Sequence, residues 1–140
     1  MTQNNFIKFI LAILLAFSIS ACSTDVPTVS PTQAAQLFSD QQAVIVDVRE
    51  QAEWDEQHID GAIFIPLNQV ENRMSELTQY KDSPIIVQCR SGRRSNIAGA
   101  KLIDAGFTKV YNLEGGILAW DKQGLETVQT ATTKLMSRHD

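Results

Sequence analysis

The chain has 140 residues and a formal net charge of −4, and 44% of its residues are hydrophobic. This length allows one domain, and the composition is that of an ordinary globular protein. Three of its 12 Lys and Arg residues lie between positions 90 and 94, and no basic stripe extends beyond them. Nucleic-acid binding is therefore not indicated, and a small anion is the partner that this charge pattern favours.

The N-terminal segment has the pattern of an export signal. Lys8 is followed by an unbroken apolar run over residues 9–17 and then by small and polar residues. Because a membrane-spanning helix needs about 20 apolar residues, this run is too short to be one. We interpret residues 1–21 as a secretory signal peptide, which would be removed from the mature protein.

The residues Ile19-Ser20-Ala21-Cys22 resemble the lipobox of bacterial lipoproteins. The resemblance implies that Cys22 carries lipid and becomes the first residue of the mature chain, with several acyl chains as a stable anchor. Ser23 after this cysteine is similar to the signal for the outer membrane. We expect an exported, periplasmic protein held at the outer membrane through Cys22. The alternative is ordinary signal cleavage, which would leave a soluble periplasmic protein.

The two ends of the mature chain have little that could pack. Residues 23–32 contain two prolines and several Ser and Thr residues, so we interpret residues 22–30 as the lipidated cysteine and a tether. Ser30-Pro31 has the pattern of a helix start, and a helix is expected over residues 32–38. Residues 125–140 lack a sustained apolar face and are interpreted as a C-terminal tail. The predicted domain therefore covers residues 31–124.

Short apolar runs alternate with helical patterns through this domain. Apolar and β-branched residues predict strands, and their nearly continuous apolar character is typical of strands buried on both faces of a sheet. The predicted strands are 43–48, 62–65, 84–87 and 109–113, and the predicted helices are 67–77, 96–105 and 117–120, with a helical turn in the loop 50–60. The alternation predicts an α/β fold, a mostly parallel sheet flanked by helices on both faces.

One loop carries the chemistry: residues 89–95 link the strand at 84–87 to the helix at 96–105. In parallel sheets, ligands bind beyond the carboxyl ends of the strands, which is where Cys89 lies. The start of a helix offers free N–H groups and partial positive charge, and three arginines add fixed charge. Both effects lower the pKa of a thiol, so Cys89 is predicted to be a nucleophile. The alternative, a small buried hydrophobe, is disfavoured by the arginines.

The cysteine count narrows the possible chemistry. If Cys22 carries lipid, Cys89 is the only thiol of the mature chain, and no internal disulfide is possible. A Cys-x-x-Cys oxidoreductase mechanism is excluded because no second cysteine accompanies Cys89. An unpaired thiol outside the cytoplasm is a liability unless it has a function, which favours the nucleophile.

Several short motifs, taken in order, are similar to those of the rhodanese-like single-domain sulfurtransferases, and the resemblance covers residues 32–124. The motifs are Val46-Asp47-Val48-Arg49, Glu53-Trp54, His58-Ile59-Asp60-Gly61-Ala62, Ile65-Pro66-Leu67, Cys89-Arg90-Ser91-Gly92-Arg93-Arg94-Ser95, and Leu113-Glu114-Gly115-Gly116 with Trp120. The resemblance implies a single rhodanese-like domain. In it Cys89 would accept a sulfane sulfur, typically from thiosulfate, and pass it from a persulfide to cyanide or a thiol. No cofactor or metal is implied, and we expect a monomer.

The resemblance also implies roles for individual loop residues. Cys89 would be the catalytic residue, and no base is required once its thiolate has formed. The other loop residues would bind the substrate: their N–H groups would cradle the persulfide anion, and any of the three arginines could hold an oxyanion. These substrate-binding residues are Arg90, Ser91, Gly92, Arg93, Arg94 and Ser95.

Asp47, Arg49 and His58 are expected to support the site. Asp47 and Arg49 would form an ion pair at the sheet edge near the site, and His58 would order its own loop. Two residues depart from the family pattern: Gln57 stands where glycine is common, and Asp60 stands where proline is common. These departures affect the expected conformation of the loop but not the chemistry of the thiol.

Two rival functions are weighed against sulfur transfer. Phosphatases and arsenate reductases of the Cys-x₅-Arg type need an arginine at the position of Ser95, whereas Arg94 falls one residue too early. A loop shorter by one residue would accommodate a single sulfur atom better than a tetrahedral phosphoryl group. The second rival is a non-catalytic binding or sulfur-carrier module that docks a partner protein, since a fold does not determine function.

Overall fold

The computed structural model describes residues 25–130. The predicted signal peptide, the predicted lipidation site Cys22 and residues 131–140 of the predicted tail lie outside the described residues. Within the described part of the chain, no helix is both long enough and apolar enough to cross a membrane.

Within residues 25–130, five parallel strands form one sheet in the order β1-β5-β4-β2-β3. The strands are β1 (Thr28–Val29), β2 (Val44–Asp47), β3 (Ile63–Phe64), β4 (Ile85–Gln88) and β5 (Val110–Leu113). Asp47 lies in register with Gln88, and Val87 lies in register with Asn112. The carboxyl ends of β2, β4 and β5 therefore meet at one end of the sheet, directly before Cys89.

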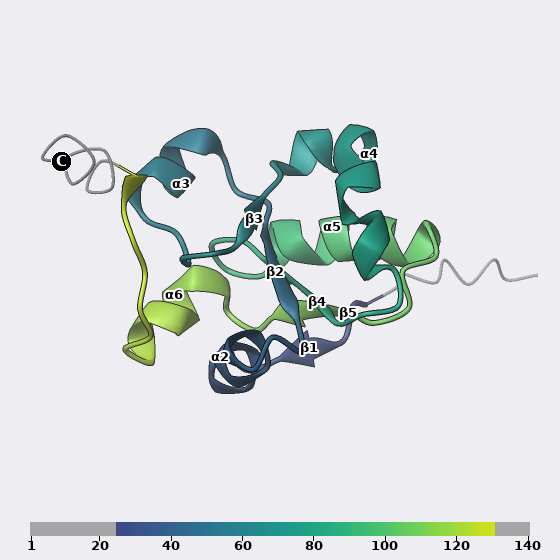
Figure 1. Ribbon diagram of the computed structural model, residues 1–140. Coiled ribbons are helices and arrows are strands. Elements are labelled where there is room, and N and C mark those ends of the chain that lie inside the picture. The colour runs from purple at the N-terminus through teal and green to yellow at the C-terminus, as the bar shows by residue number, and fades with distance from the viewer. Residues whose placement is uncertain (1–24, 131–140) are drawn as a thin grey trace, which may run out of the picture.

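Helices cover both faces of the sheet, as predicted (Figure 1). The helices are α2 (Pro31–Ser39), α3 (Gln51–Glu56), α4 (Val70–Arg73), α5 (Arg93–Asp104) and α6 (Gly116–Lys122), with the 3₁₀ helices η1 (Leu67–Gln69) and η2 (Met74–Tyr80). The helix predicted over 67–77 is thus divided into η1, α4 and η2. One core lies between the sheet and α4, η2 and α5, and a second core lies under α2 and α6. The α/β fold class is confirmed.

The side chains of the central strand β4 alternate between the two cores. Ile85 and Val87 belong to the core under α5, and Ile86 belongs to the core under α2 and α6. Successive side chains of a strand point to opposite faces, so Cys89 continues the first set. Its side chain accordingly lies in the core under α5.

Two helix starts follow from local chemistry. At α2, Ser30 Oγ accepts from the Gln33 N–H at 3.3 Å, and the Gln33 side chain accepts from the Ser30 N–H at 3.4 Å. This reciprocal arrangement is a capping box. α5 begins at Arg93 instead of residue 96, because Gly92 (φ 103°) adopts a left-handed conformation and turns the chain directly into the helix. The last residues of the predicted loop therefore form the first turn of α5.

The predicted tether, residues 22–30, needs correction at its C-terminal end. Val26 is 3% exposed and lies in the core under α5, and its N–H donates to Asn96 Oδ1 at 3.1 Å. Thr28 and Val29 form β1, which pairs in parallel with β5. A strand of two residues is too short to produce an alternating pattern, so the sequence does not reveal it.

The predicted tail, residues 125–140, needs correction at its start. Leu125 packs on the core under α2 and α6, and the Trp120 indole N–H donates to the carbonyl of Glu126 at 3.0 Å. His58 and Val128 exchange two backbone hydrogen bonds of 2.8 Å each. Residues 125–128 are therefore fixed to the loop that follows α3.

We expect Val26→Ala to lower the free energy of unfolding by about 1–3 kcal/mol, because it removes buried methyl groups and leaves a cavity. The side chain of Val26 packs directly on Gly99 of α5. Thr28→Ala is the matched control, since Thr28 is exposed in the same segment. Urea denaturation of both variants measures the difference. Equal stabilities would show that this segment does not pack on the domain.

Candidate functional site

Hydrogen-bond donors surround the thiol of Cys89, which is only 1% exposed. The Gly92 N–H donates to Sγ at 3.1 Å, and the Ser95 hydroxyl lies 3.3 Å from Sγ. The backbone N–H groups of Ser91 and Ser95 are close enough to the sulfur to lower the pKa of the thiol as well. The cysteine is buried as a structural cysteine would be, but the backbone of the loop and of the first turn of α5 is wrapped around its sulfur.

Burial and hydrogen bonding act on this thiol in opposite directions. Burial raises the pKa of Cys89, whereas the Ser95 hydroxyl, when its proton points at Sγ, and the N–H groups of Ser95, Gly92 and Ser91 lower it. The hydrogen bonds prevail, and the pKa of the thiol lies below its ordinary value. At a given pH, a larger fraction of this thiol is therefore ionised than of an unperturbed cysteine.

The N-terminus of α6 holds the loop in this conformation. Ile117 N–H donates to the carbonyl of Cys89 at 2.9 Å, and Leu118 N–H donates to that of Arg90 at 3.3 Å. The C=O and N–H groups of one peptide point in opposite directions, so fixing the Arg90 carbonyl on α6 also fixes the direction of the Ser91 N–H. The approach requires glycine at position 116, because a Cβ there would lie 2.4 Å from the carbonyl oxygen of Cys89.

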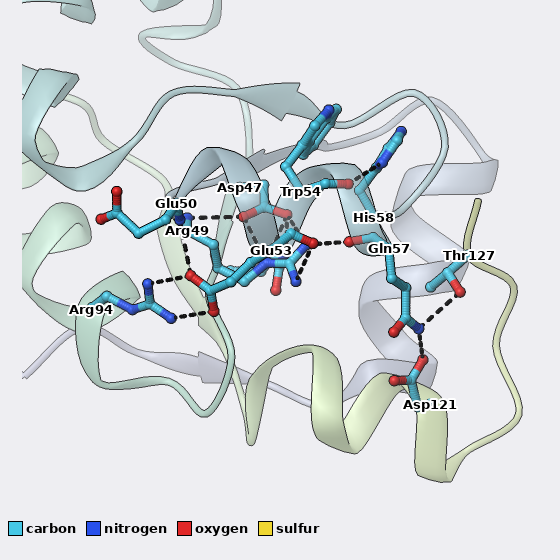
Figure 2. A network of polar contacts seen from close by, with 11 residues as sticks. Asp47, Arg49, Glu50, Glu53, Trp54, Gln57, His58, Arg94, Asp121 and Thr127 are labelled. Carbon is cyan, nitrogen blue, oxygen red and sulfur yellow. Dashed lines mark hydrogen bonds and ion pairs between the residues drawn. The ribbon is translucent and has the colours of Figure 1, made fainter. Parts of the chain in front are cut away.

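The three loop arginines differ in their surroundings. Arg94 forms a two-pronged ion pair with Glu53 of α3, with N···O distances of 2.7 and 2.8 Å (Figure 2). Arg90 and Arg93 are exposed, and their side chains make no ion pair within residues 25–130. Arg94 is therefore committed to α3, whereas Arg90 and Arg93 are available to solutes.

The pair has a defined pH dependence. The hydrogen bonds from Arg94 lower the pKa of Glu53 from 4.5 to about 2. A carboxylate whose pKa is lower in the folded protein contributes stability above its unfolded pKa. The contribution of Glu53 is thus complete above pH 4.5 and is lost as the pH falls towards 2.

Asp47 and Arg49 form the predicted ion pair, with 2.7 Å between Arg49 Nη2 and Asp47 Oδ2. The exposed fraction is 4% for the Arg49 side chain and 0% for that of Asp47. Gln88 Nε2 also donates to Asp47 Oδ2, at 2.5 Å. Arg49 Nη2 donates to the carbonyl of Gln57 at 2.7 Å (Figure 2). The pair therefore joins β2, β4 and the loop after α3, and it stands behind the site as structural support.

The side chain of His58 contacts Trp54 of its own segment. Its ring stacks on Trp54 with 3.8 Å between centroids, and its Nδ1 lies 2.8 Å from the carbonyl of Trp54. Gln57, the residue that replaces a common glycine, reaches across to α6 and to the segment after it: its Nε2 donates to Asp121 at 2.6 Å and to Thr127 at 2.9 Å (Figure 2). The departure from the family pattern thus adds contacts that hold residues 125–128.

Asn112 of β5 completes the site and is not predicted from the sequence. Its Nδ2 donates to the carbonyl of Gly92 at 2.9 Å, and its Oδ1 accepts from the Ser95 hydroxyl at 2.6 Å. The available signal is a polar residue inside an otherwise apolar strand, the same signal that identifies Asp47 in β2. The sequence identifies Glu53 and Gly116 as parts of motifs, but it does not predict the ion pair of Glu53 with Arg94 or the close approach of α6 to the loop at Gly116.

Comparison with known proteins agrees with this geometry. Residues 30–123 match the family model described as Rhodanese-like domain. The chain is 37% identical over 99 residues to "Sulfurtransferase" of Allochromatium vinosum, which covers 71% of this chain and 91% of that protein. It is 37% identical over 92 residues to "Thiosulfate sulfurtransferase GlpE" of Pseudomonas fluorescens, which covers 64% of this chain and 81% of that protein.

Two further similarities concern proteins without a named activity. The chain is 37% identical over 111 residues to the uncharacterized protein slr1261 of Synechocystis, covering 79% of this chain but only 60% of that longer protein. The crystal structure of the Alr3790 protein from Anabaena is similar with a TM-score of 0.68 and 26% identity, covering 79% of this chain and 87% of that one. The family model spans the elements from α2 to α6 that enclose the thiol, and the chain belongs to the rhodanese-like domain family.

Proposed function

We propose that this protein is a sulfurtransferase in which Cys89 carries a sulfane sulfur as a persulfide. The donor is thiosulfate or a related sulfane compound, and the acceptor is cyanide or a thiol. The observation that carries the proposal is the set of backbone N–H groups around Sγ, with the Ser95 hydroxyl beside them. Two relatives named as sulfurtransferases, one of them for thiosulfate, support the same class of reaction. The donors around Sγ come from one chain, so a monomer suffices.

The reaction proceeds in two displacements at sulfur. The Cys89 thiolate attacks the outer sulfur of thiosulfate, and the S–S bond of thiosulfate breaks with its electron pair leaving on sulfite. The negative charge of the thiolate is then carried by the terminal sulfur of the persulfide, where loop N–H groups would stabilise it. The acceptor next attacks that terminal sulfur, and the Cys89 thiolate leaves.

Loop size and charge pairing favour sulfur transfer over phosphoryl transfer. Only residues 90–92 separate Cys89 from the first residue of α5. Arg94 lies nearest to the position of a phosphatase arginine, but its guanidinium is already paired with Glu53. A phosphoryl group would need that guanidinium as well as a longer loop.

After incubation with thiosulfate, mass spectrometry of the purified protein is expected to show one added sulfur atom on Cys89. Cys89→Ser should abolish this addition and thiosulfate:cyanide transfer, because a neutral hydroxyl does not attack sulfane sulfur as a thiolate does. Circular dichroism should show an unchanged fold. Sulfur transfer retained by the serine variant would refute the proposal.

We expect Arg90→Ala to raise the KM for thiosulfate about tenfold or more, because a charge-assisted hydrogen bond to the donor is lost. Arg90 lines a pocket beside the loop, between residues of α3 and α6. The kcat should change little. Steady-state kinetics at varied thiosulfate concentration separates the two parameters.

Arg94→Ala is the matched comparison and should act mainly on stability. Removing the partner of Glu53 should lower the free energy of unfolding by about 1 kcal/mol, since both side chains are partly exposed. A larger rise in KM for Arg94→Ala than for Arg90→Ala would contradict the assignment of Arg90 to the donor.

We also propose that Cys22 is lipidated and attaches the protein to the outer membrane from the periplasmic side. The lipobox-like residues before Cys22 support this proposal. In cells labelled with tritiated palmitate, the protein should become radioactive and sediment with membranes. Cys22→Ala should remove the label; a variant that is still labelled would contradict lipidation at this residue.

A further inference from the structure

Two acceptors compete for the single proton of the Ser95 hydroxyl. Ser95 Oγ lies 3.3 Å from Cys89 Sγ and 2.6 Å from Asn112 Oδ1. A hydroxyl donates one hydrogen bond, so it can satisfy only one of these atoms at a time. Ser95 is fully buried and Asn112 is 7% exposed, so solvent has little access to replace the bond that is not made.

The orientation of the Asn112 amide is fixed at its other end. Nδ2 donates to the carbonyl of Gly92 at 2.9 Å. Exchanging the amide oxygen and nitrogen would set Oδ1 against that carbonyl oxygen, which is repulsive. The backbone of Asn112 is also held, because its N–H donates to the carbonyl of Pro27 at 2.8 Å. Asn112 therefore presents only an acceptor to Ser95.

The two ionisation states of the thiol make different demands on Ser95. In the neutral thiol, Sγ–H can donate to Ser95 Oγ while Ser95 donates to Asn112, so every group is satisfied. In the thiolate, Sγ needs donors. Turning the Ser95 proton towards Sγ leaves two oxygens 2.6 Å apart with no proton between them. Asn112 thus opposes the stabilisation of charge on Sγ by Ser95.

We propose that Asn112 is a positioning residue that holds the Ser95 proton and so favours negative charge on the terminal sulfur of the persulfide over charge on Sγ itself. This inference rests on the proposed sulfur transfer. In the persulfide, Sγ is bonded to the second sulfur and the charge lies on that outer atom, which leaves Ser95 free to donate to Asn112. Between the free thiolate and the persulfide, the Ser95 hydroxyl proton changes direction. The other changes are the bonds made and broken in the sulfur transfer. The sulfur-loaded form is favoured over the free thiolate.

The charged groups around the thiol stay in place when Asn112 is replaced by a neutral residue. The charged side chains on the surrounding elements are Asp47 at the end of β2 and Arg49 after it, Glu50, Glu53, Asp55 and Glu56 at α3, Arg90, Arg93 and Arg94 in the loop and the first turn of α5, Lys101 and Asp104 farther along α5, and Asp121 and Lys122 on α6. Among these, Arg94 interacts with the thiol: its pKa is raised by Glu53 and, less strongly, by charge on Cys89. A change in thiol ionisation in an Asn112 variant therefore reports on the hydrogen bonds.

The test is a double-mutant cycle on thiol ionisation in the purified full chain. The pH dependence of alkylation by iodoacetamide, followed on the Cys89 peptide by mass spectrometry, measures ionisation without a sulfur donor. Asn112→Ala should raise the ionisation constant of the thiol about fivefold, the worth of roughly one hydrogen bond. In the Ser95→Ala background, the same substitution should change the constant by less than about twofold.

Asn96→Ala is the matched control, because the Oδ1 of Asn96 accepts from Val26 and not from Ser95. It should leave thiol ionisation unchanged. A lower ionisation constant in Asn112→Ala, or an equal rise with and without Ser95, would overturn the proposal. If Asn112→Ala does not fold, the ionisation constant of the thiol in Ser95→Ala tests the proposal instead. A proton committed to Asn112 predicts a fall of less than about threefold in the constant, and a fall of about tenfold or more would overturn the proposal.

A second readout separates this inference from the proposed function. At a pH where the free thiol is ionised and at a fixed ratio of thiosulfate to sulfite, Asn112→Ala should lower the ratio of persulfide to free protein about fivefold. Normal persulfide formation with unchanged ionisation would overturn the role of Asn112 alone. A shifted ionisation in a protein that never takes up sulfur would overturn the sulfur transfer and leave the role of Asn112 at the thiol standing.

Discussion

A sulfur that must carry negative charge inside a protein core needs donors on every accessible side, and the loop after β4 is built to meet that requirement. Burial alone would raise the pKa of Cys89, and the hydrogen bonds of the loop reverse the direction. The donors converge only because two glycines permit it. Gly92 turns the chain into α5 with a left-handed conformation, and Gly116 lets α6 approach the carbonyls of Cys89 and Arg90.

Ion pairing among the charged side chains near the site leaves the backbone N–H groups to stabilise the sulfur anion. Arg49 is neutralised by Asp47, and Arg94 is neutralised by Glu53. Of the three arginines predicted to surround the thiol, Arg94 thus links α5 to α3, whereas Arg90 and Arg93 stay exposed. N–H groups that are already oriented can stabilise a sulfur anion without reorganisation. Exposed arginines such as Arg90 are better suited to attracting the anionic donor than to tuning the thiol.

The sequence predicts the parallel sheet, the helical layers and the position of Cys89, because these depend on apolar periodicity and on one loop that is contiguous in the chain. It does not predict that Arg94 pairs with Glu53 or that Asn112 meets Ser95, since each contact joins residues far apart in sequence. Side-chain pairing depends on distances that only the folded sheet sets. The predicted ion pair of Asp47 with Arg49 succeeds because its partners lie two residues apart on one strand end.

Two segments predicted to be a tether and a tail, residues 26–29 and 125–128, instead support elements of the site whose contacts the sequence does not predict. At one side, residues 26–29 hold β5: the Pro27 carbonyl accepts from the backbone N–H of Asn112, and Val26 donates to α5. At the other side, residues 125–128 hold the loop after α3 through Gln57 and His58. The first segment thus contacts β5, which carries Asn112, and the second contacts the loop that directly follows α3, which carries Glu53. Precise placement of donors around the sulfur therefore depends on segments far from it in the chain, which lack any apolar pattern of their own.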